Sequence, residues 1–370
     1  MNKKNNPQKV FVGLSGGVDS AVTAMLLKKQ GYDVIGAYMK LWRERDSLAE
    51  KNSEKEEENA RKVAEAVGVK FLVWNMKNDF KKEVVKYFLD EYAAGRTPNP
   101  CVRCNRDIKF GLFVEKAFES GADFVATGHY ARIREEVSVS DAERKKHSYK
   151  LLKAKDDNKD QSYFLYNLDQ KTLKKIIFPL GNFTKGEVRE IARREGLFVY
   201  NKLESQEVCF IGEKYYGDFL KRQNVKMKEG DIVDEAGNIL GKHRGLPFYT
   251  LGQRRDIRIG GTGPYFVTGI DYKNNRLIVS NDTESEKLFA REFTIREAHW
   301  IDGKASEFPV KAKAKIRYRM EEIPATIMKE KTKIVVRLSK KSRAVMPGQS
   351  AVFYQHDRVL GGGVIGEVLD

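Results

Sequence analysis

The stretch that decides the fold is KVFVGLSGGVDSAVTAMLLKKQG, residues 9–31. A short β-rich run comes first, the turn Ser15–Ser20 follows, and a helical stretch completes it. Glycines between a strand and a helix let backbone N–H groups approach a phosphate, and the positive end of the helix adds to the attraction. A lone SGG can also be an ordinary tight turn. In this strand, turn and helix context the pattern predicts a cradle for a pyrophosphate group.

The same alternation of β-rich and helical runs continues to about residue 212. The later members are YDVIGAYM, VKFLVWNM, two helices around residues 80–92 and 108–118, and ADFVATGHY. Such alternation is typical of βαβ units and a parallel sheet. We expect the end of ADFVATGHY to lie at the ligand edge of that sheet. The charged segment at 134–146 is expected to form a mobile hairpin tip.

The remaining chain is β-rich and divides into two parts. Glycines and short alternating runs predict a small, mostly β central domain at 213–288. Further short strands at turn-punctuated spacing predict a closed antiparallel barrel at 289–370. The expected architecture is thus an α/β domain at 1–212 followed by two β domains.

The charge balance favours a polyanionic partner. The 370 residues contain 68 Lys and Arg against 52 Asp and Glu, a formal net charge of +16. Between Lys311 and Arg343 stand twelve basic and three acidic residues, so this segment holds +9 of the total. A strand would place Lys311, Lys313, Lys315, Arg317 and Arg319 on one face. That face suits a nucleic-acid backbone, although a merely solvated barrel surface would look the same.

Compartment and membrane association follow from what the chain lacks. The apolar run after the basic first ten residues is too short for a signal peptide, and no stretch approaches the length of a membrane span. Three cysteines are too few for a secreted disulfide framework. We expect a cytoplasmic protein with no membrane partner.

The turn at 15–20 resembles the PP-loop of ATP pyrophosphatases rather than a Walker or dinucleotide-binding loop. Enzymes of that kind hold the β,γ-phosphates of ATP while a substrate oxygen attacks the α-phosphate. Asp19 would then hold Mg²⁺ against the phosphates, because a hard cation prefers carboxylate and phosphate oxygens.

Two of the cysteines lie in the proline-punctuated segment TPNPCVRCN, residues 97–105, which we expect to be a loop. Arg96, Arg103 and Arg106 flank Cys101 and Cys104, and clustered arginines favour the reactive thiolate. Cys209 follows 105 residues after Cys104. Any one of these cysteines, considered alone, is more typical of a buried inert residue than of a catalytic one.

A series of motifs resembles the bacterial and organellar tRNA-specific 2-thiouridylases, the MnmA family. They include SGGVDS, AGRTPNPCVRCNRDIKFG, ATGHYAR, NKDQSYFLY, CFIGE, GLPFYTLGQRR and PGQSAVFY, in this order from about Lys9 to the C-terminus. The resemblance implies a PP-loop α/β domain (adenine nucleotide alpha hydrolase-like), a small central domain and a C-terminal barrel. It implies 2-thiolation of the wobble uridine in the tRNAs for lysine, glutamate and glutamine.

The resemblance also implies roles for individual residues. Cys104 takes the nucleophile position and Cys209 the persulfide position. The ATP-binding positions are Gly13, Leu14, Ser15, Gly16, Gly17, Val18, Asp19, Ser20, Met39 and Gly128. The positions that meet the target base are Asn99, Pro100 and Cys101. The tRNA-contacting positions are His129, Lys159, Asp160, Gln161, Arg317, Tyr318 and Gln349. The implied partners are tRNA and a sulfur-carrier protein or cysteine desulfurase, and we expect a monomer.

Two departures from the family pattern leave alternatives open. Cys101 stands where many members have Asp, and the run 202–208 differs from the usual sequence before the cysteine. Three converging cysteines allow a persulfide on Cys209 released by a disulfide with Cys104, which we favour. They also allow an iron–sulfur cluster on Cys101, Cys104 and Cys209.

Two other functions remain as alternatives. A lysidine-type or GMP-synthetase-type PP-loop enzyme would adenylate its substrate without transferring sulfur. A non-catalytic RNA-binding protein would carry a degenerate ATP site, against which the intact SGGVDS argues.

Overall fold

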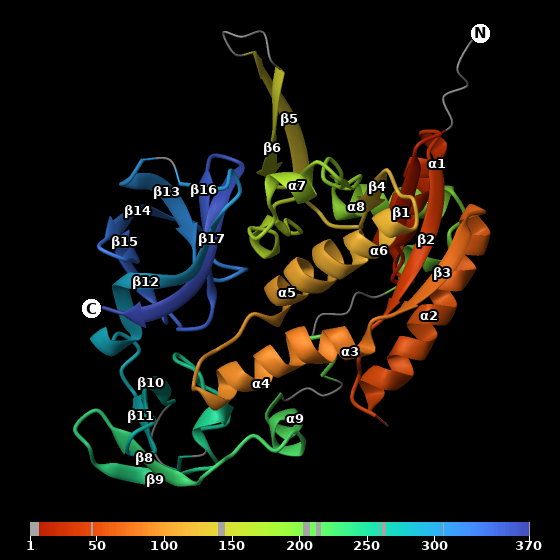
Figure 1. Ribbon diagram of the computed structural model, residues 1–370. Helices are drawn as coiled ribbons and strands as arrows, with labels where there is room; N and C mark the ends of the chain where they lie inside the picture. The colour runs from red at the N-terminus through yellow and green to blue at the C-terminus, as the bar shows by residue number, and fades with distance from the viewer. Residues whose placement is uncertain are drawn as a thin grey trace, which may run out of the picture.

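The computed structural model describes residues 7–45, 47–139, 145–202, 208–211, 216–257, 259–260, 264–305 and 307–369. Of the hairpin tip expected at 134–146, residues 134–139 and 145–146 belong to two strands and residues 140–144 lie outside the described residues. Most of the unusual run before Cys209, residues 203–207, also lies outside them. Figure 1 shows the α/β domain on the right, the C-terminal barrel on the left and the central domain below them.

A five-stranded sheet in the order β3-β2-β1-β4-β7 forms the α/β domain, and all its strand pairs are parallel. The predicted parallel sheet is therefore confirmed. Its strands are β1 (Lys9–Gly13), β2 (Asp33–Lys40), β3 (Lys70–Asn75), β4 (Phe124–Ala126) and β7 (Ile176–Ile177). The helices of this part and the segment after it are α1 (Val18–Lys29), α2 (Leu48–Val67), α3 (Lys77–Phe80), α4 (Lys86–Ala93), α5 (Pro100–Arg103), α6 (Phe113–Glu119), α7 (Gln170–Leu173), α8 (Lys185–Arg194) and α9 (Tyr216–Arg222).

Successive side chains of β1 point to opposite faces of the sheet, so the strand contributes to both apolar cores of this domain. Val10 and Val12 face a cluster that includes residues of α1, α2 and α8, whereas Phe11 faces a cluster with residues of α4 and α6. The second cluster continues into the barrel through Val352 and Tyr354. Burial of this shared apolar surface fixes the barrel against the α/β domain.

The central domain is a four-stranded sheet in the order β10-β11-β8-β9, with its own apolar cluster. Its strands are β8 (Gly230–Asp234), β9 (Ile239–His243), β10 (Phe266–Asp271) and β11 (Arg276–Ser280).

Six antiparallel strands form the C-terminal barrel, which closes where β12 pairs with β17. They are β12 (Phe289–Trp300), β13 (Val310–Lys315), β14 (Ile323–Glu330), β15 (Lys333–Arg343), β16 (Ser350–Gln355) and β17 (Arg358–Val368). The predicted closed barrel is confirmed. The expected five-residue basic face is wrong, because β13 ends at Lys315 and the chain turns before Arg317.

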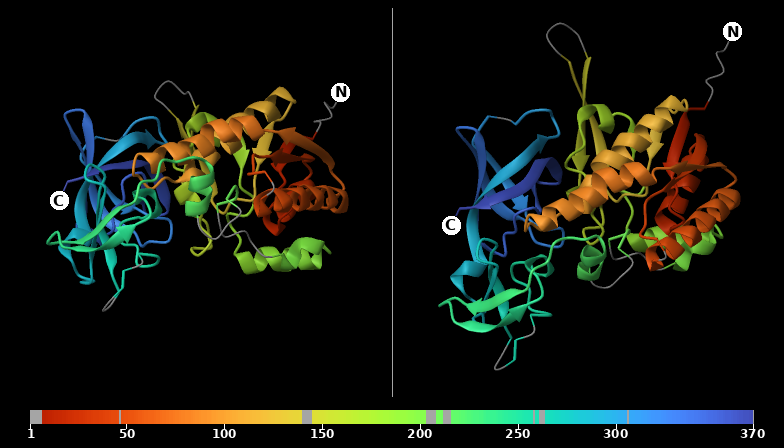
Figure 2. Two further views of the ribbon diagram at one scale, coloured as in Figure 1. Left: turned by 90° about the horizontal axis from the view of Figure 1, so that it is seen from below. Right: turned by 60° about the horizontal axis from the view of Figure 1, so that its bottom comes forward.

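A hairpin of the α/β domain, β5 (Arg132–Val139) and β6 (Lys145–Leu152), extends the barrel sheet: Leu152 pairs with Arg358 of β17. Arg132 forms an ion pair with Asp357 and Lys150 forms another with Asp302. The two views of Figure 2 agree that the hairpin rises between the barrel and the parallel sheet. The first and last domains are therefore joined by backbone pairing as well as by packing.

Candidate active site

The turn after β1 is held by its own serines. The Ser20 hydroxyl accepts from the Ser15 amide at 3.1 Å and donates to the Gly17 carbonyl at 3.1 Å. Gly16 has φ +70°, and a Cβ there would lie 2.5 Å from the carbonyl oxygen of Glu56 in α2. Only glycine suits this position, on conformational and on steric grounds. The turn therefore presents backbone at the start of α1, as a phosphate cradle requires.

Asp19, in the first turn of α1, has two partners that the sequence did not reveal. Its carboxylate accepts hydrogen bonds from Lys185 Nζ at 2.7 and 2.8 Å and from the Tyr130 hydroxyl at 2.8 Å. Lys185 is distant by 166 residues in sequence and reaches Asp19 from the start of α8. The phosphate loop thus carries a buried cation beside its one carboxylate.

The ends of β2 and β4 complete this side of the loop. A Cβ on Gly13 would lie 3.4 Å from the Met39 methyl group, and one on Gly128 would lie 2.9 Å from the backbone of Asp19. Strands β1, β2 and β4 are neighbours in the sheet. The structure therefore brings Met39 and Gly128 together with the turn at 15–20.

Cys101 and Cys104 lie in a helix and not in the expected loop. The helical segment runs from Pro100 through α5, a π-helical stretch at Cys104–Leu112, and α6. The Asn99 side chain caps it by accepting from the Val102 amide at 3.3 Å. A proline at the first position of a helix costs nothing, because its missing N–H would have no helical partner. This is why the proline-rich sequence is compatible with a helix.

The thiols of this helix are held protonated by burial. Burial raises the pKa of Cys104 to about 12, against a lowering effect of Lys109 and a further rise from Cys209 and Cys101. Part of Cys101 is exposed to solvent. Many protein atoms nevertheless surround its thiol, and the resulting desolvation raises the pKa of this thiol to about 11. The expectation of arginine-activated thiolates is wrong, because the flanking arginines are engaged elsewhere.

Those arginines pair with carboxylates. Arg96 forms an ion pair with Glu91, and both Arg103 and Arg106 form ion pairs with Asp107. Their charge is therefore neutralised locally instead of reaching the thiols.

Cys209 is exposed and is placed by its neighbour. Phe210 is buried against Phe80 and Phe88, with ring centroids 5.6 and 5.4 Å apart. Arg43 Nη1 lies 3.8 Å from the Cys209 sulfur, a contact that sequence reasoning missed. Negative charge on Cys209 or on Cys101 raises the pKa of Cys104, so the fold does bring the three cysteines into one neighbourhood. All three are free thiols.

Within the described part of the chain, no three His, Cys, Asp or Glu side chains are grouped so as to hold a metal ion. Cys101, Cys104 and Cys209 all belong to that part. As arranged here, the three sulfurs do not fit the cluster alternative.

The segment before Cys101 is clamped by the barrel. The Thr97 amide donates to the Pro347 carbonyl at 2.9 Å, and Gln349 Nε2 donates to the carbonyls of Thr97 and Pro98, both at 3.2 Å. Gly348, with φ +94°, allows this approach, since a Cβ there would lie 2.8 Å from the Thr97 oxygen. Gln349, which was expected to contact tRNA, is thus hydrogen-bonded to the segment just before Asn99, Pro100 and Cys101, which were expected to meet the target base.

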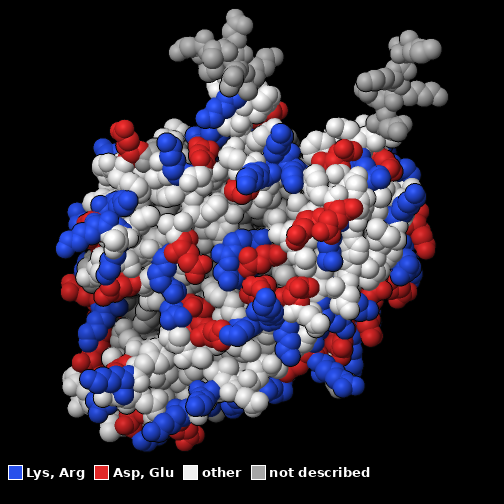
Figure 3. Space-filling model, viewed as in Figure 1, with Lys and Arg blue, Asp and Glu red and all other residues white. Residues whose placement is uncertain are grey.

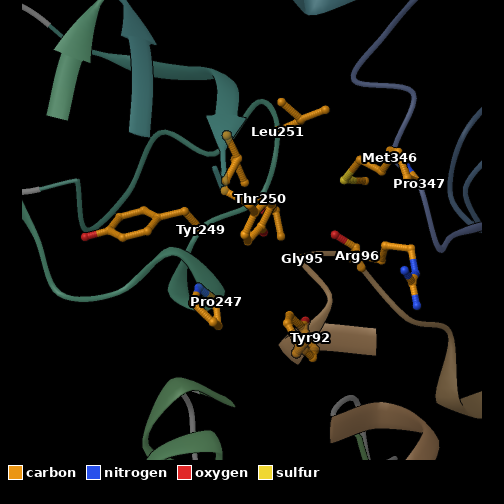
Figure 4. A pocket seen from close by; sticks show the side chains of 12 residues that line it. Tyr92, Gly95, Arg96, Pro247, Tyr249, Thr250, Leu251, Met346 and Pro347 are labelled. Carbon is orange, nitrogen blue, oxygen red and sulfur yellow. The ribbon is translucent and has the colours of Figure 1, made fainter. Parts of the chain in front are cut away.

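A cavity of about 170 Å³ opens beside Thr97, where the three domains meet. Figure 4 shows Tyr92 and Arg96 of the α/β domain, Tyr249 and Leu251 of the central domain, and Met346 of the barrel around it. The segment 95–97 therefore touches all three domains.

Most of the other residues that were expected to contact tRNA have partners within the protein. Asp160 is buried and accepts from the amides of Ala154 and Ser162, and Gln161 accepts from the Tyr130 amide. Tyr318 packs on Phe164 with ring centroids 4.4 Å apart.

Three residues remain of that set. His129 is buried, and burial lowers its pKa well below the usual value. Arg317 donates to the Arg343 carbonyl at 3.2 Å. Lys159 is half-buried. Of the whole set, Gln349 and Tyr318 make contacts that join the barrel to the α/β domain.

Charge on the surface is mixed. On the face drawn in Figure 3, basic and acidic side chains are interspersed. Lys311 and Lys313 of β13 are exposed. No helix among the described residues is long and apolar enough to cross a membrane.

Fold and site together define a PP-loop type of nucleotide-binding α/β domain joined to two β domains. The family models that match the chain are the tRNA methyl transferase HUP domain at residues 8–213, the tRNA methyl transferase PRC-barrel domain at 217–281 and the aminomethyltransferase beta-barrel domain at 290–365.

Two curated relatives align over nearly the full length. The chain is 45% identical to "tRNA-specific 2-thiouridylase MnmA 1" of Clostridium botulinum (strain Okra / Type B1), covering 97% of this chain and 99% of the relative. It is 44% identical to "tRNA-specific 2-thiouridylase MnmA" of Clostridioides difficile (strain 630), covering 97% and 98%. The chain belongs to the tRNA-specific 2-thiouridylase family, whose members are transferases.

Among solved structures, a 4-thiouridine synthetase in complex with RNA and ATP is similar over 58% of this chain and 50% of that chain. The two are 19% identical, with a TM-score of 0.34. This likeness is too slight to add to the family assignment.

Proposed function

We propose that this protein is an ATP-dependent enzyme that replaces the C2 oxygen of the wobble uridine in the tRNAs for lysine, glutamate and glutamine with sulfur. The observation that carries the proposal is that Cys209, which interacts with Cys101 and Cys104 about 105 residues earlier, is linked to the PP-loop: Arg43 contacts both Cys209 and Glu56, and the Glu56 backbone meets Gly16. An adenylating enzyme that transfers no sulfur needs a phosphate loop but not this arrangement of cysteines.

In the proposed first step the uracil O2 attacks the α-phosphate of ATP, and pyrophosphate leaves. The turn at 15–20, with Met39 and Gly128, binds the nucleotide. Lys185 and Tyr130 hold Asp19 at the start of α1, where Lys185 can move to the phosphates as they bind. Mg²⁺ brought with ATP would take Asp19 and phosphate oxygens as ligands and would neutralise phosphate charge.

In the second step a persulfide anion on Cys209 attacks C2 through its terminal sulfur, and AMP leaves with the former O2. The Cys104 thiolate then attacks the inner sulfur of Cys209. The S–S bond breaks, its electron pair stays on the sulfur bound to C2, and a Cys104–Cys209 disulfide forms. An external dithiol must reduce that disulfide, and a sulfur-carrier protein or cysteine desulfurase must reload Cys209, before the next turnover.

Cys104 must lose its thiol proton before it can attack the Cys209 sulfur. Its raised pKa means that few molecules carry the thiolate at neutral pH in the arrangement described here. Lys109 lowers the pKa of both Cys104 and Cys101. Cys104 therefore acts once the substrate has changed its surroundings, with Lys109 as the nearby stabilising charge.

The test separates the proposal from both alternatives. Pyrophosphate release is measured with and without tRNA for the wild type and for Cys209→Ser, together with sulfur incorporation into tRNA. We expect tRNA-dependent release in both proteins and thiolation in the wild type alone. Thiolation by Cys209→Ser would overturn the sulfur-transfer role, and absence of any release would favour a non-catalytic RNA-binding protein.

A further inference from the structure

Arg43 links the Cys209 sulfur to helix α2. Its Nη1 lies 3.8 Å from Cys209 Sγ, and its Nη2 lies 3.7 Å from Glu56 Oε2. The Arg43 side chain is only 9% exposed. A guanidinium group is permanently charged and carries donors on two edges, so it can face a carboxylate and a sulfur together.

Glu56 lies between that arginine and the phosphate loop. Its backbone carbonyl packs directly against Gly16, and Lys202 Nζ donates to the Gly16 carbonyl at 2.9 Å. Burial raises the pKa of the Glu56 carboxyl, while the charges of Arg43 and Lys202 lower it. The Glu56 carboxylate thus interacts with two cations: Lys202, which is bonded to the phosphate loop, and Arg43, which contacts the Cys209 sulfur.

We propose that Arg43 is a positioning residue for sulfur transfer, which holds the Cys209 sulfur in place as an anion and is itself oriented by Glu56. The proposal rests on the proposed function, in which Cys209 carries the persulfide. Sulfur attacks as an anion, and a cation within hydrogen-bond reach favours the charged form. Arg43 keeps its protons throughout, so it changes no bond in the reaction.

The surroundings of Cys209 make Arg43 the cation best placed for this task. Cys101 and Cys104 interact electrostatically with Cys209, so negative charge on one of these sulfurs opposes negative charge on the others. Lys109 acts on Cys101 and Cys104, and Lys202 is bonded to the phosphate loop. An alternative explanation is that Arg43 simply ties the end of β2 to α2 as an ion pair, which requires no effect on the sulfur.

The experiment measures iodoacetamide labelling of each cysteine by peptide mass spectrometry between pH 6 and 9.5, without tRNA, ATP or sulfur donor. Arg43→Gln should slow labelling of Cys209 about tenfold at pH 7, and Arg43→Lys should restore part of the rate. Cys101 should be unaffected. Lys40→Gln is the matched control, because Lys40 pairs with Glu57 of the same helix at 3.0 Å. If Cys209 of Arg43→Gln is labelled at the wild-type rate at every pH, the proposal is overturned.

A second variant guards against misfolding. If Arg43→Gln unfolds, all three cysteines will be labelled rapidly. Arg43→Met, which keeps the aliphatic part of the side chain, then takes its place, and we expect the same tenfold slowing of Cys209 labelling. In a single turnover, Arg43→Gln should slow thiolation while the preceding burst of pyrophosphate release is unchanged. The labelling result involves no substrate, so it can fail while the proposed function stands, whereas thiolation by Cys209→Ser would remove the proposed function itself.

Discussion

Gln349 of the barrel donates its side-chain amide to the backbone carbonyl of Thr97 at 3.2 Å, four residues before Cys101. A second bond, to Pro98, has the same length. The barrel thereby sets the position of the segment that is proposed to meet the target base, without needing to touch that base.

Gln349→Ala should lower the single-turnover thiolation rate about fivefold while the Kd for tRNA changes less than twofold. The reason is that a lost hydrogen bond of this kind is worth about 1 kcal/mol and acts on the placement of the base. Rapid-quench thiolation and filter binding measure the two quantities. Gln355→Ala, at the exposed end of β16, is the control. A large loss of tRNA affinity with an unchanged rate would instead support direct contact with tRNA.

Asp19→Ala should reduce pyrophosphate release about a hundredfold, a loss typical for a group that stabilises charge in the transition state. Lys185 and Tyr130 lose their shared partner in this variant. Binding of tRNA should stay within twofold of the wild type, because Asp19 serves the phosphates. Asp33→Ala, exposed at the opposite end of the sheet, is the control. Full pyrophosphate release by Asp19→Ala would remove the PP-loop assignment.

Replacing Lys311 and Lys313 together with Gln should weaken tRNA binding and make the plot of log affinity against log salt shallower. The expected change is roughly 0.7 to 0.9 per lost phosphate contact. Both side chains are exposed on β13. Lys51→Gln with Lys62→Gln, on the exposed face of α2, removes the same charge elsewhere. If the salt dependence of tRNA affinity has the same slope in both double variants, Lys311 and Lys313 make no contact with tRNA.

Cys104 of the substrate-free protein should label more slowly with iodoacetamide than Cys101 between pH 7 and 9. Burial raises the pKa of both thiols, to about 12 and about 11, and the reagent attacks the thiolate. Labelling of Cys104 should still be rising at pH 10, and Lys109→Gln should slow it further. A Cys104 labelling midpoint near pH 7 would contradict the buried, protonated thiol.

Cys101→Ser should retain substantial thiolation when the protein is purified without oxygen. The proposed reaction assigns bond changes to Cys104 and Cys209 only. Thiolation is measured together with iron content and visible absorption. Joint loss of iron, colour and activity in this variant would reinstate the cluster chemistry, and an iron-free, active wild type would exclude it.

The sequence was informative where the signal is local. A strand, a glycine turn and a helix at 9–31 suffice to predict the phosphate loop and its parallel sheet, because these features depend on neighbouring residues. Alternating runs likewise predicted the barrel. The strand Ile323–Glu330 is hard to recognise in the sequence, because Pro324 argues against a strand.

The sequence-based predictions were wrong where a contact between residues distant in the sequence determines the structure. The arginines near Cys104 looked like activating charges, but Asp107 and Glu91 engage them. Alternation of Lys and Arg continued past Lys315, but the chain turns there. Asp19 meets Lys185 only through the packing of α8 on α1, and Arg43 meets Cys209 across 166 residues of chain. No motif marks either pair.

The pairing of Leu152 with Arg358 also has a consequence for biosynthesis. A ribosome makes the chain from the N-terminus, so the hairpin at 132–152 emerges about 200 residues before the strand that it pairs with. Until β17 is complete, β6 presents an open edge of the kind that invites pairing with other chains. Strand β17 therefore closes the barrel and covers this edge in a single step, and the edge of β6 stays open until that strand has been made.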